Sequence, residues 1–193
     1  MIGSVLTTGA YPPGARGAQA GPHGRQLGAY SGRMEKTLTT EAPSTTTDVS
    51  SARFPEHLPA ALTEILQGHG CVPDALYAKL GMEVTEASAE RVAGSMPVAG
   101  NTQPYSMLHG GASLAFAETL ASIAAVLHAG PSRVAYGAEV SATHHRAARS
   151  GVVHGEAVAL HRGLSSVTYE VAIRDDKGRR LCSARVTCGV RRR

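Results

Sequence analysis

The pattern of apolar positions predicts one long helix over residues 111–128. No proline occurs in this range, and apolar residues recur at the three-and-four spacing of one buried helical face. They are Leu114, Ala117, Leu120, Ala121, Ala124 and Leu127. Gly130 and Pro131 follow the pattern and are typical of a helix end. Glu118 therefore lies in the middle of a helix made mostly of apolar and small residues.

The segments on either side of this helix alternate with a partial period of two, which is typical of β-strands. After the helix the ranges are 133–141, 151–159, 166–174 and 181–190, and before it a hairpin is predicted at 82–87 and 90–97. Residues 175–178 supply a turn in which Gly178 can adopt a positive φ. Shorter helices are predicted over 54–70 and 74–80. The expected fold class is α+β, with the long helix wrapped by an antiparallel sheet of five to six strands.

His109, Gly110 and Gly111 occupy the predicted first turn of the long helix. Backbone N–H groups at that end have no intrahelical partner, and the helix dipole favours negative charge there. Glycine lets a substrate carbonyl approach these amides closely, so a developing oxyanion would be stabilised. The alternative is that the two glycines begin the helix and have no catalytic role.

Glu118 is the candidate catalytic carboxylate. A carboxylate held among apolar side chains has a raised proton affinity, so it can act as a general base or a nucleophile near neutral pH. Ser122 follows it by four residues on the same helical face. Taken alone, a single glutamate on a helix is more often a solvent-exposed surface residue.

The spacing of His109 and Glu118 predicts a site that is shared between two chains. At about 100° per residue, nine residues amount to roughly half a turn, so one helix directs the two side chains to opposite sides. One substrate could meet both groups only if a second copy of the helix supplied one of them. We therefore expect a homodimer with shared active sites.

The run from Asn101 to Tyr105, the His-Gly-Gly-Ala-Ser sequence that begins at His109, and the glutamate nine residues after that histidine together resemble the hotdog-fold acyl-CoA thioesterases. The most similar branch contains the 1,4-dihydroxy-2-naphthoyl-CoA, 4-hydroxybenzoyl-CoA and phenylacetyl-CoA hydrolases. The resemblance covers about residues 74–190 and is strongest over 101–122. It implies the hotdog fold, and it implies assembly into dimers and often homotetramers.

The resemblance also implies roles for individual residues. Glu118 matches the catalytic carboxylate, and Gly110 matches the amide that polarises the thioester carbonyl. Ser122 matches a hydroxyl that helps to place the water. Gln103 and His109 match the polar side chains that orient the thioester.

Two further segments and one glycine match positions that contact coenzyme A (CoA) in that family. They are Gly137, His144, His145, Arg146, Ala147, His161, Arg162, Gly163, Leu164, Ser165 and Ser166. Arginine suits phosphate because its guanidinium donates two parallel hydrogen bonds. Taken alone, the His-His-Arg cluster would more often be a solvated loop. No second cluster with the spacing of zinc ligands accompanies it, so we expect no metal, and no cofactor besides the CoA of the substrate.

The predicted function is hydrolysis of an acyl-CoA thioester, and the resemblance favours an aryl-acyl group. The alternative is a protein of this fold that binds or senses acyl-CoA without turnover, although binding alone has no use for a base beside the thioester carbon. The hydratases of the same fold would need an Asp/His pair at their own spacing, which is not found here.

The first 53 residues are poor candidates for any core. Glycine and proline are frequent over residues 1–28, and a Thr/Ser-rich run follows as far as Ser51. We expect a disordered extension over residues 1–53 and one hotdog domain over 54–193. The lack of acidic residues before Glu35 is weakly typical of a transit peptide, but glycines and prolines would break its helix. A misassigned start, with Met34 as one internal candidate, fits better.

Charge and cysteine content narrow the partners and the compartment. Nineteen basic and fifteen acidic side chains give a net charge of +4, but there is no Trp and no basic patch interleaved with aromatics, so nucleic-acid binding is not expected. Cys182 and Cys188 would lie about 20 Å apart along one strand, beyond the reach of a disulfide. Reduced thiols and the lack of a secretory segment favour the cytoplasm. Glu118 interrupts the long helix, so no membrane span is expected.

Overall fold

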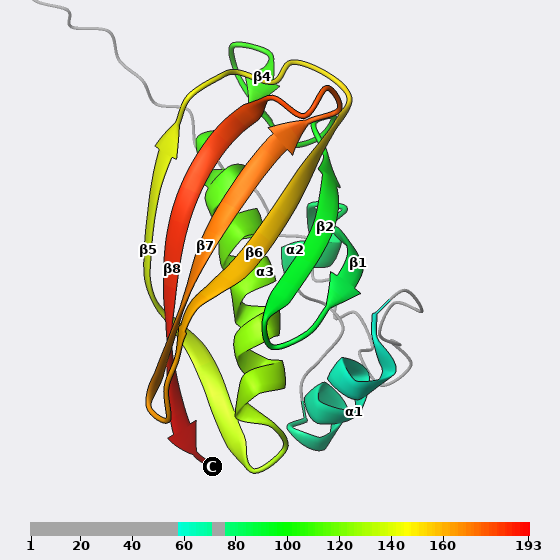
Figure 1. Cartoon of the computed structure of the whole chain (residues 1–193). Coiled ribbons are helices and arrows are strands. Elements are labelled where there is room, and N and C mark those ends of the chain that lie inside the picture. Colours follow the sequence, from blue (N-terminus) through cyan, green and yellow to red (C-terminus); the bar gives the residue numbers. More distant parts are fainter. Residues whose placement is uncertain (1–57, 71–75) are drawn as a thin grey trace, which may run out of the picture. The chain divides into compact units, whose positions relative to one another are not determined.

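The computed structural model describes residues 58–70 and 76–193 (Figure 1). In chain order the elements are α1 (Ala60–Gly68), α2 (Leu76–Lys79), β1 (Glu83–Ala87), β2 (Arg91–Pro97), β3 (Thr102–Gln103), β4 (Met107–Leu108), α3 (Gly110–Ala129), β5 (Arg133–His144), β6 (Val152–Arg162), β7 (Ser166–Asp175) and β8 (Arg180–Arg192). The predicted extension over 1–53 lies outside the described residues, as do residues 54–57 and 74–75 of the two predicted short helices.

Six strands form one antiparallel sheet in the order β1-β2-β6-β7-β8-β5. Figure 1 shows α3 lying along one face of this curved sheet. The predicted α+β hotdog arrangement, a long helix wrapped by an antiparallel sheet, is therefore confirmed. Among the residues that the structure describes, β5 is an edge strand paired with β8 alone, so the backbone groups along its other side are available to a further strand.

The core lies between α3 and the sheet, and it depends on a close approach of the helix to β6. A Cβ atom on Gly155 would lie 2.6 Å from atoms of both Leu120 and Phe116, so these side chains pack directly on the β6 backbone. The predicted buried face of the helix was partly wrong. Leu114 and Leu127 are only half-buried, whereas Phe116 is completely buried because Gly155 leaves room for its ring.

α3 extends one residue beyond the prediction at each end. His109 is its N-cap, and ring Nδ1 of that histidine accepts a hydrogen bond from the Gly111 N–H at 2.8 Å. Gly130 follows the helix with a φ of 68°, a conformation that favours glycine. By length and composition alone α3 could cross a membrane, but buried core helices often meet the same criterion, so this is weak evidence for a span.

The predicted strands are confirmed, and they differ from the structure mainly at their ends. β5 and β6 continue to His144 and Arg162, three residues beyond the predicted limits of 141 and 159. The β3–β4 hairpin was missed, because strands of two residues are too short to show alternation. Gly178 adopts a φ of 75° in the turn between β7 and β8, as expected.

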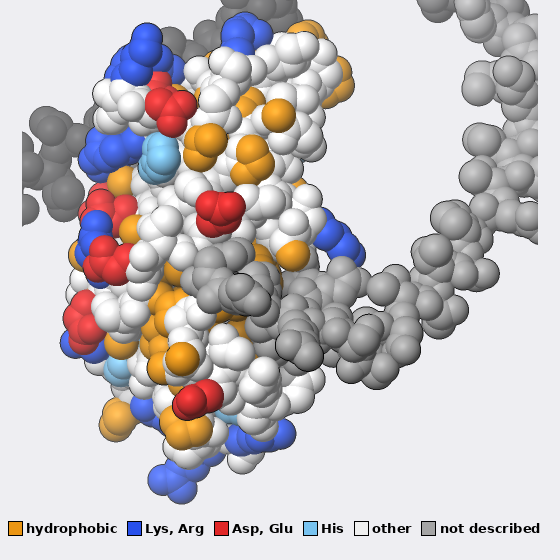
Figure 2. Space-filling model, turned by 90° about the vertical axis from the view of Figure 1, so that its right-hand side faces the viewer, with side chains coloured by type: hydrophobic (Ala, Val, Ile, Leu, Met, Phe, Trp, Pro, Cys, Tyr) orange, Lys and Arg blue, Asp and Glu red, His pale blue; other side chains and the backbone are white. Residues whose placement is uncertain are grey.

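The outer face of the sheet, turned away from α3, carries ion pairs between neighbouring strands. Arg91 pairs with Glu86 and Glu156 on this face. At the end of β6, Arg162 pairs with Glu90 of the turn between β1 and β2. Figure 2, which views the molecule from the side of β1 and β2, shows basic and acidic side chains gathered along one margin. These exposed pairs contribute little stability individually, but they keep this face polar.

Candidate active site

The first turn of α3 leaves one backbone amide without a partner. The His109 ring binds the N–H of Gly111, and the His109 carbonyl accepts from the N–H groups of Ala112 at 3.0 Å and Ser113 at 3.2 Å. Within residues 58–70 and 76–193, nothing accepts a hydrogen bond from the Gly110 N–H. The helix dipole adds positive potential there, so Gly110 can donate to a substrate carbonyl or oxyanion.

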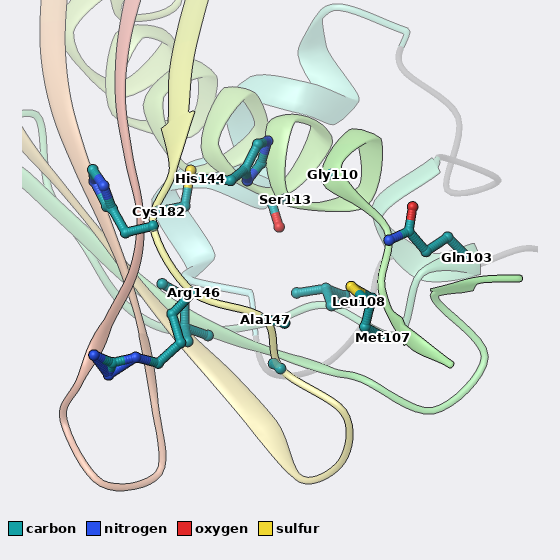
Figure 3. Close-up of a pocket in the computed structure, with 12 residues that line it drawn as sticks. Gln103, Met107, Leu108, Gly110, Ser113, His144, Arg146, Ala147 and Cys182 are labelled. Carbon is teal, nitrogen blue, oxygen red and sulfur yellow. The ribbon is translucent and has the colours of Figure 1, made fainter. Parts of the chain in front are cut away.

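A cavity of about 390 Å³ opens beside this turn (Figure 3). Its walls come from the β3–β4 hairpin, the first turn of α3, the end of β5 with the loop that follows, and the start of β8. Six residues that the sequence nominated lie in its lining, namely Gln103, Gly110, His144, His145, Arg146 and Ala147. Met107, Leu108 and Leu181 add apolar surface. The structure therefore joins the predicted oxyanion donor to one of the two predicted CoA segments.

The histidine at the end of β5 lies against the oxyanion donor. A Cβ atom on Gly110 would be 3.1 Å from His144 Nε2, so the imidazole packs over this glycine. Figure 3 shows Gln103 on a different wall of the cavity, and it shows the Arg146 side chain directed away from the centre. His109 is exposed and does not line the cavity, because its ring turns back to cap the helix.

Backbone hydrogen bonds hold the loop over residues 145–149 in place. The His145 N–H donates to the Leu181 carbonyl of β8, and the Ala148 carbonyl accepts from the Leu108 N–H of β4, both at 2.7 Å. The loop is thus fixed on two sides. This construction favours a binding wall over the solvated loop that was the alternative for the His-His-Arg cluster.

Asn101 supports the site, and sequence reasoning missed this role. Its side-chain amide donates to the carbonyls of Leu80 at 2.8 Å and Pro97 at 2.9 Å, and its own carbonyl accepts from the His109 N–H at 2.9 Å. These bonds fix the hairpin that carries Gln103 to the start of α3. A buried asparagine at the head of the motif was the available signal, but residue type alone does not show that a side chain points inward.

Glu118 belongs to a second cluster, outside the cavity. Its carboxylate lies against Gly137 of β5, where a Cβ atom would clash with Oε1. Ser122, one helical turn later, places its Oγ 4.0 Å from Cys188 Sγ, and Cys188 pairs with Gly137 across the two strands. The expected apolar surroundings of Glu118 are incomplete, because this side chain is exposed at the open edge of the sheet.

The second predicted CoA segment, residues 161–166, lies near the C-terminal end of α3. The Gly163 carbonyl is 2.9 Å from Nε2 of His128 near that end. Arg162, at the end of β6, has its guanidinium paired with Glu90. One chain therefore does not bring this segment to the cavity, which lies at the opposite end of the helix.

The buried thiols are poor nucleophiles. Burial raises the pKa of Cys182, in the cavity wall, and also that of Cys188, so both remain protonated near neutral pH. Both are free, as their spacing predicted. Across the described part of the chain, no three His, Cys, Asp or Glu side chains gather into a group that could hold a metal ion. The groups that the arrangement does offer are the Gly110 amide beside the cavity and the exposed Glu118 carboxylate on the same helix.

Comparison with known proteins adds the family to this geometry. The model of the thioesterase superfamily matches residues 105–182, a range that includes Gly110, Glu118, Ser122 and Gly137. Over 116 residues the chain is 43% identical to the proofreading thioesterase EntH of Klebsiella pneumoniae. This alignment covers 60% of this chain and 85% of EntH. The family match therefore includes Gly110 beside the cavity and Glu118 with its neighbours Ser122 and Gly137, whereas Gln103 lies before the matched range.

Solved structures of thioesterases share the fold. A mutant thioesterase of Pseudomonas aeruginosa superposes with a TM-score of 0.62 at 31% identity, over 73% of this chain and 100% of that chain. A thioesterase of Haemophilus influenzae superposes with a TM-score of 0.59 at 30% identity, over 62% of this chain and 84% of that chain.

Proposed function

This chain belongs to the thioesterase superfamily, and from that premise we propose that it hydrolyses an acyl-CoA thioester, preferably one with an aryl-acyl group. The observation that carries the proposal is the unpartnered Gly110 N–H beside a cavity, on the same helix as the accessible carboxylate of Glu118. Thioester hydrolysis needs an oxyanion donor and a base, and these are the two groups that supply them. The aryl preference rests on the resemblance of residues 101–122.

In the proposed reaction the thioester carbonyl accepts a hydrogen bond from the Gly110 N–H, and Glu118 takes a proton from the attacking water. The water oxygen bonds to the carbonyl carbon, which gives a tetrahedral oxyanion held by the same amide. Collapse of this intermediate breaks the C–S bond and releases the free acid, and the CoA thiolate takes up the proton from Glu118. Gln103 and His109 would orient the thioester, and Ser122 would orient the water.

Glu118 has a second possible role as the nucleophile. Its carboxylate would then attack the carbonyl carbon and expel the CoA thiolate, which leaves a mixed anhydride that water hydrolyses. Both routes use the Gly110 amide in the same way. They differ in the origin of one oxygen of the first acid released when water attacks the Glu118 carbonyl of the anhydride, because the acid then keeps an oxygen of the carboxylate and Glu118 takes up the oxygen of water.

In this proposal each complete site lies between two chains. The free edge of β5 can pair with the same edge of a second copy, antiparallel about a two-fold axis. If the axis crosses β5 midway between Gly137 and His144, Gly137 of one chain lies opposite His144 of the partner subunit. Because Glu118 contacts Gly137 and Gly110 contacts His144, this pairing would bring Glu118 to the Gly110 amide of the partner subunit.

The same pairing would unite the two segments proposed to bind CoA. Residues 144–147 lie at the end of β5, whereas the turn within residues 161–166 lies near the start of that strand, where Arg133 contacts the Leu164 carbonyl. In an antiparallel pair the end of one strand lies beside the start of the other. Loop and turn would therefore come from different chains, which accounts for their separation within one chain.

The remaining features of the proposal concern assembly and location. We propose a cytoplasmic homodimer that pairs further into a homotetramer, with no metal or added cofactor and no nucleic-acid or membrane partner. The free thiols of β8 support a reducing compartment. The outer face of the sheet, which edge-to-edge pairing of β5 leaves uncovered, supplies a surface for the second level of assembly.

A second candidate function is acyl-CoA binding without turnover. One observation favours it: Glu118 is exposed and lies outside the cavity in the single chain. A panel of aryl, short and long acyl-CoA thioesters, assayed by thiol release, distinguishes the two functions. We expect turnover by the natural chain, with aryl-acyl thioesters preferred.

The decisive variant in this assay is Glu118→Gln, which keeps the shape of the side chain and removes the base. It should lose about 10²-fold or more in kcat, the contribution typical of a general base, while it still binds the thioester. Glu170→Gln, on the outer face of β7, is the matched control and should keep its activity. Full turnover by Glu118→Gln would remove this carboxylate from the mechanism, and binding without turnover by the natural chain would support the second candidate.

A further inference from the structure

The C-terminal end of α3 is tied to the turn between β6 and β7, which we call the β6–β7 turn and define as residues 163–165. His128 Nε2 donates to the Gly163 carbonyl at 2.9 Å. Arg133 donates to the helix carbonyls of Ala129 at 3.0 Å and His128 at 3.1 Å, and its third contact, at 3.5 Å, is the Leu164 carbonyl. One histidine and one arginine thus join the helix end to the turn.

These contacts belong to a pattern in which every carbonyl of the turn is bonded. The Ser165 carbonyl accepts from the Val190 N–H of β8 at 2.8 Å, which completes the set begun by Gly163 and Leu164. The amides of Leu164 and Ser165, in contrast, have no acceptor among the residues that the structure describes. Both residues are exposed. The turn therefore engages its oxygen atoms internally and leaves two consecutive N–H groups free.

Consecutive free backbone N–H groups make an anion-binding surface, because each is a fixed partial positive charge. The neighbouring guanidinium of Arg162 is paired with Glu90. The two backbone amides, rather than this arginine, are therefore the donors left to bind an anion. The proposed substrate contains suitable anions, because CoA carries phosphate groups that must rest on the protein surface when its thioester is in the active site.

We propose that His128 and Arg133 are positioning residues, which hold the β6–β7 turn so that its two free amides bind a phosphate of CoA. The inference rests on the proposed acyl-CoA substrate. It gives α3 a role at each end, because its first turn supplies the oxyanion donor of one site and its last turn supports the phosphate contact of the other. His128 and Arg133 act through the turn and do not touch the substrate.

The test compares one acyl group on CoA with the same group on pantetheine, which carries the thioester but no phosphate. His128→Leu removes the donor to the Gly163 carbonyl at similar size. It should raise KM for the CoA thioester about five- to ten-fold and leave kcat within about two-fold, because a contact made equally in ground and transition states affects only binding. Both constants for the pantetheine thioester should stay unchanged.

Two variants make the result specific. His128→Gln keeps an N–H at a similar reach and should restore the low KM. His69→Leu is the matched control, because His69 also binds a carbonyl beyond the end of α3, that of Pro131 at 3.2 Å, without touching the turn. It should leave KM for the CoA thioester unchanged. If His128→Leu does not fold, Arg133→Lys tests the same link, since it retains the charge and loses the forked contacts.

An unchanged KM in the folded variant would overturn the inference, and so would an equal loss on both substrates, which indicates general damage. If the natural chain has the same kcat/KM on the CoA and pantetheine thioesters, it does not recognise the phosphates, and the inference is overturned while hydrolysis stands. A natural chain that releases no thiol from any CoA thioester would instead contradict the proposed function itself. A natural chain that favours CoA, combined with an unaffected His128→Leu, contradicts the positioning role alone.

Discussion

Two glycines determine where the candidate functional side chains of Glu118 and His144 can lie. The Glu118 carboxylate rests on the bare Cα of Gly137, so Gly137→Ala should displace the carboxylate while the strand is retained. We expect kcat to fall by about ten-fold or more, since catalysis is sensitive to misplacement of about 1 Å. Steady-state kinetics with a CoA thioester, on protein shown by circular dichroism to be folded, measures the effect.

A matched variant is available in α1. A Cβ atom on Gly68 would meet nothing within 4 Å, so Gly68→Ala should leave kcat unchanged. Equal activity of Gly137→Ala and Gly68→Ala would show that the position of the Glu118 carboxylate in the single chain is irrelevant to turnover.

The sequence alone could nominate a candidate site residue when the residue type itself has the chemistry that the reaction needs. Glu118 was nominated because a carboxylate within an apolar helix is unusual. Gly110 was nominated because glycine at a helix start lets a carbonyl approach the free amides, and because its segment resembles that of the thioesterases. The inward direction of Asn101 and the capping role of His109 were not predicted. Both depend on which neighbouring backbone groups lack a partner, and that is fixed only when the hairpin and the helix meet.

Among the elements, the turn between β7 and β8 is expected to stabilise the fold to an extent that depends on pH. Asp175 accepts hydrogen bonds from the Arg179 side chain at 2.8 Å and from the N–H groups of Arg179 at 2.9 Å and Lys177 at 3.0 Å. The Arg179 side chain is the largest cause that lowers the pKa of Asp175 below its usual value, and the backbone N–H groups add to it.

Because the pKa of Asp175 is lower in the folded chain than in the unfolded chain, its stabilising effect is present above the unfolded value and is lost as the pH falls through the folded value. Asp175→Asn should therefore melt at a lower temperature than the natural chain at pH 7. The difference should narrow as the pH falls below about 4. Melting curves followed by circular dichroism across this range test the expectation, and a gap that does not vary with pH would contradict it.

Long elements were predictable because their periodicity extends over many residues. α3 and the four strands after it were expected within three residues of their observed ends. The predicted buried face of α3 omitted Phe116, which is completely buried. Counting apolar residues cannot show that Gly155 of a distant strand makes room for this ring. The β3–β4 hairpin is held by tertiary contacts, such as the bond from Leu108 to Ala148, and has no periodic signal of its own.

At the scale of the whole molecule, mixing two inactive variants tests whether the site is shared. Glu118→Ala lacks the carboxylate, and Gly110→Pro lacks the donating N–H at a helix position that tolerates proline. A mixed dimer contains one wholly mutant site and one wholly natural site. After random pairing, activity should approach about a quarter of that of the natural protein, because half of the dimers are mixed.

Gly110→Ala is the control for this experiment, since it retains the N–H but places the same Cβ atom near His144. If crowding of His144 were the cause of inactivity, this variant would also be inactive. Folded mixed dimers without activity would contradict the shared site. They would indicate that the Gly110 amide and the Glu118 carboxylate of one site belong to the same chain.

The distance between the two clusters within one chain has a kinetic consequence. A solitary chain would carry an oxyanion donor without its base and a base without its donor, so it could hold a thioester but not cleave it. If the site is shared in this way, the total rate would fall with the square of the chain concentration, and turnover per chain in proportion to it, once the protein is diluted below the dissociation constant of the dimer. A newly made chain would not hydrolyse thioesters until it met a second copy. The concentration of chains would therefore determine when hydrolysis begins.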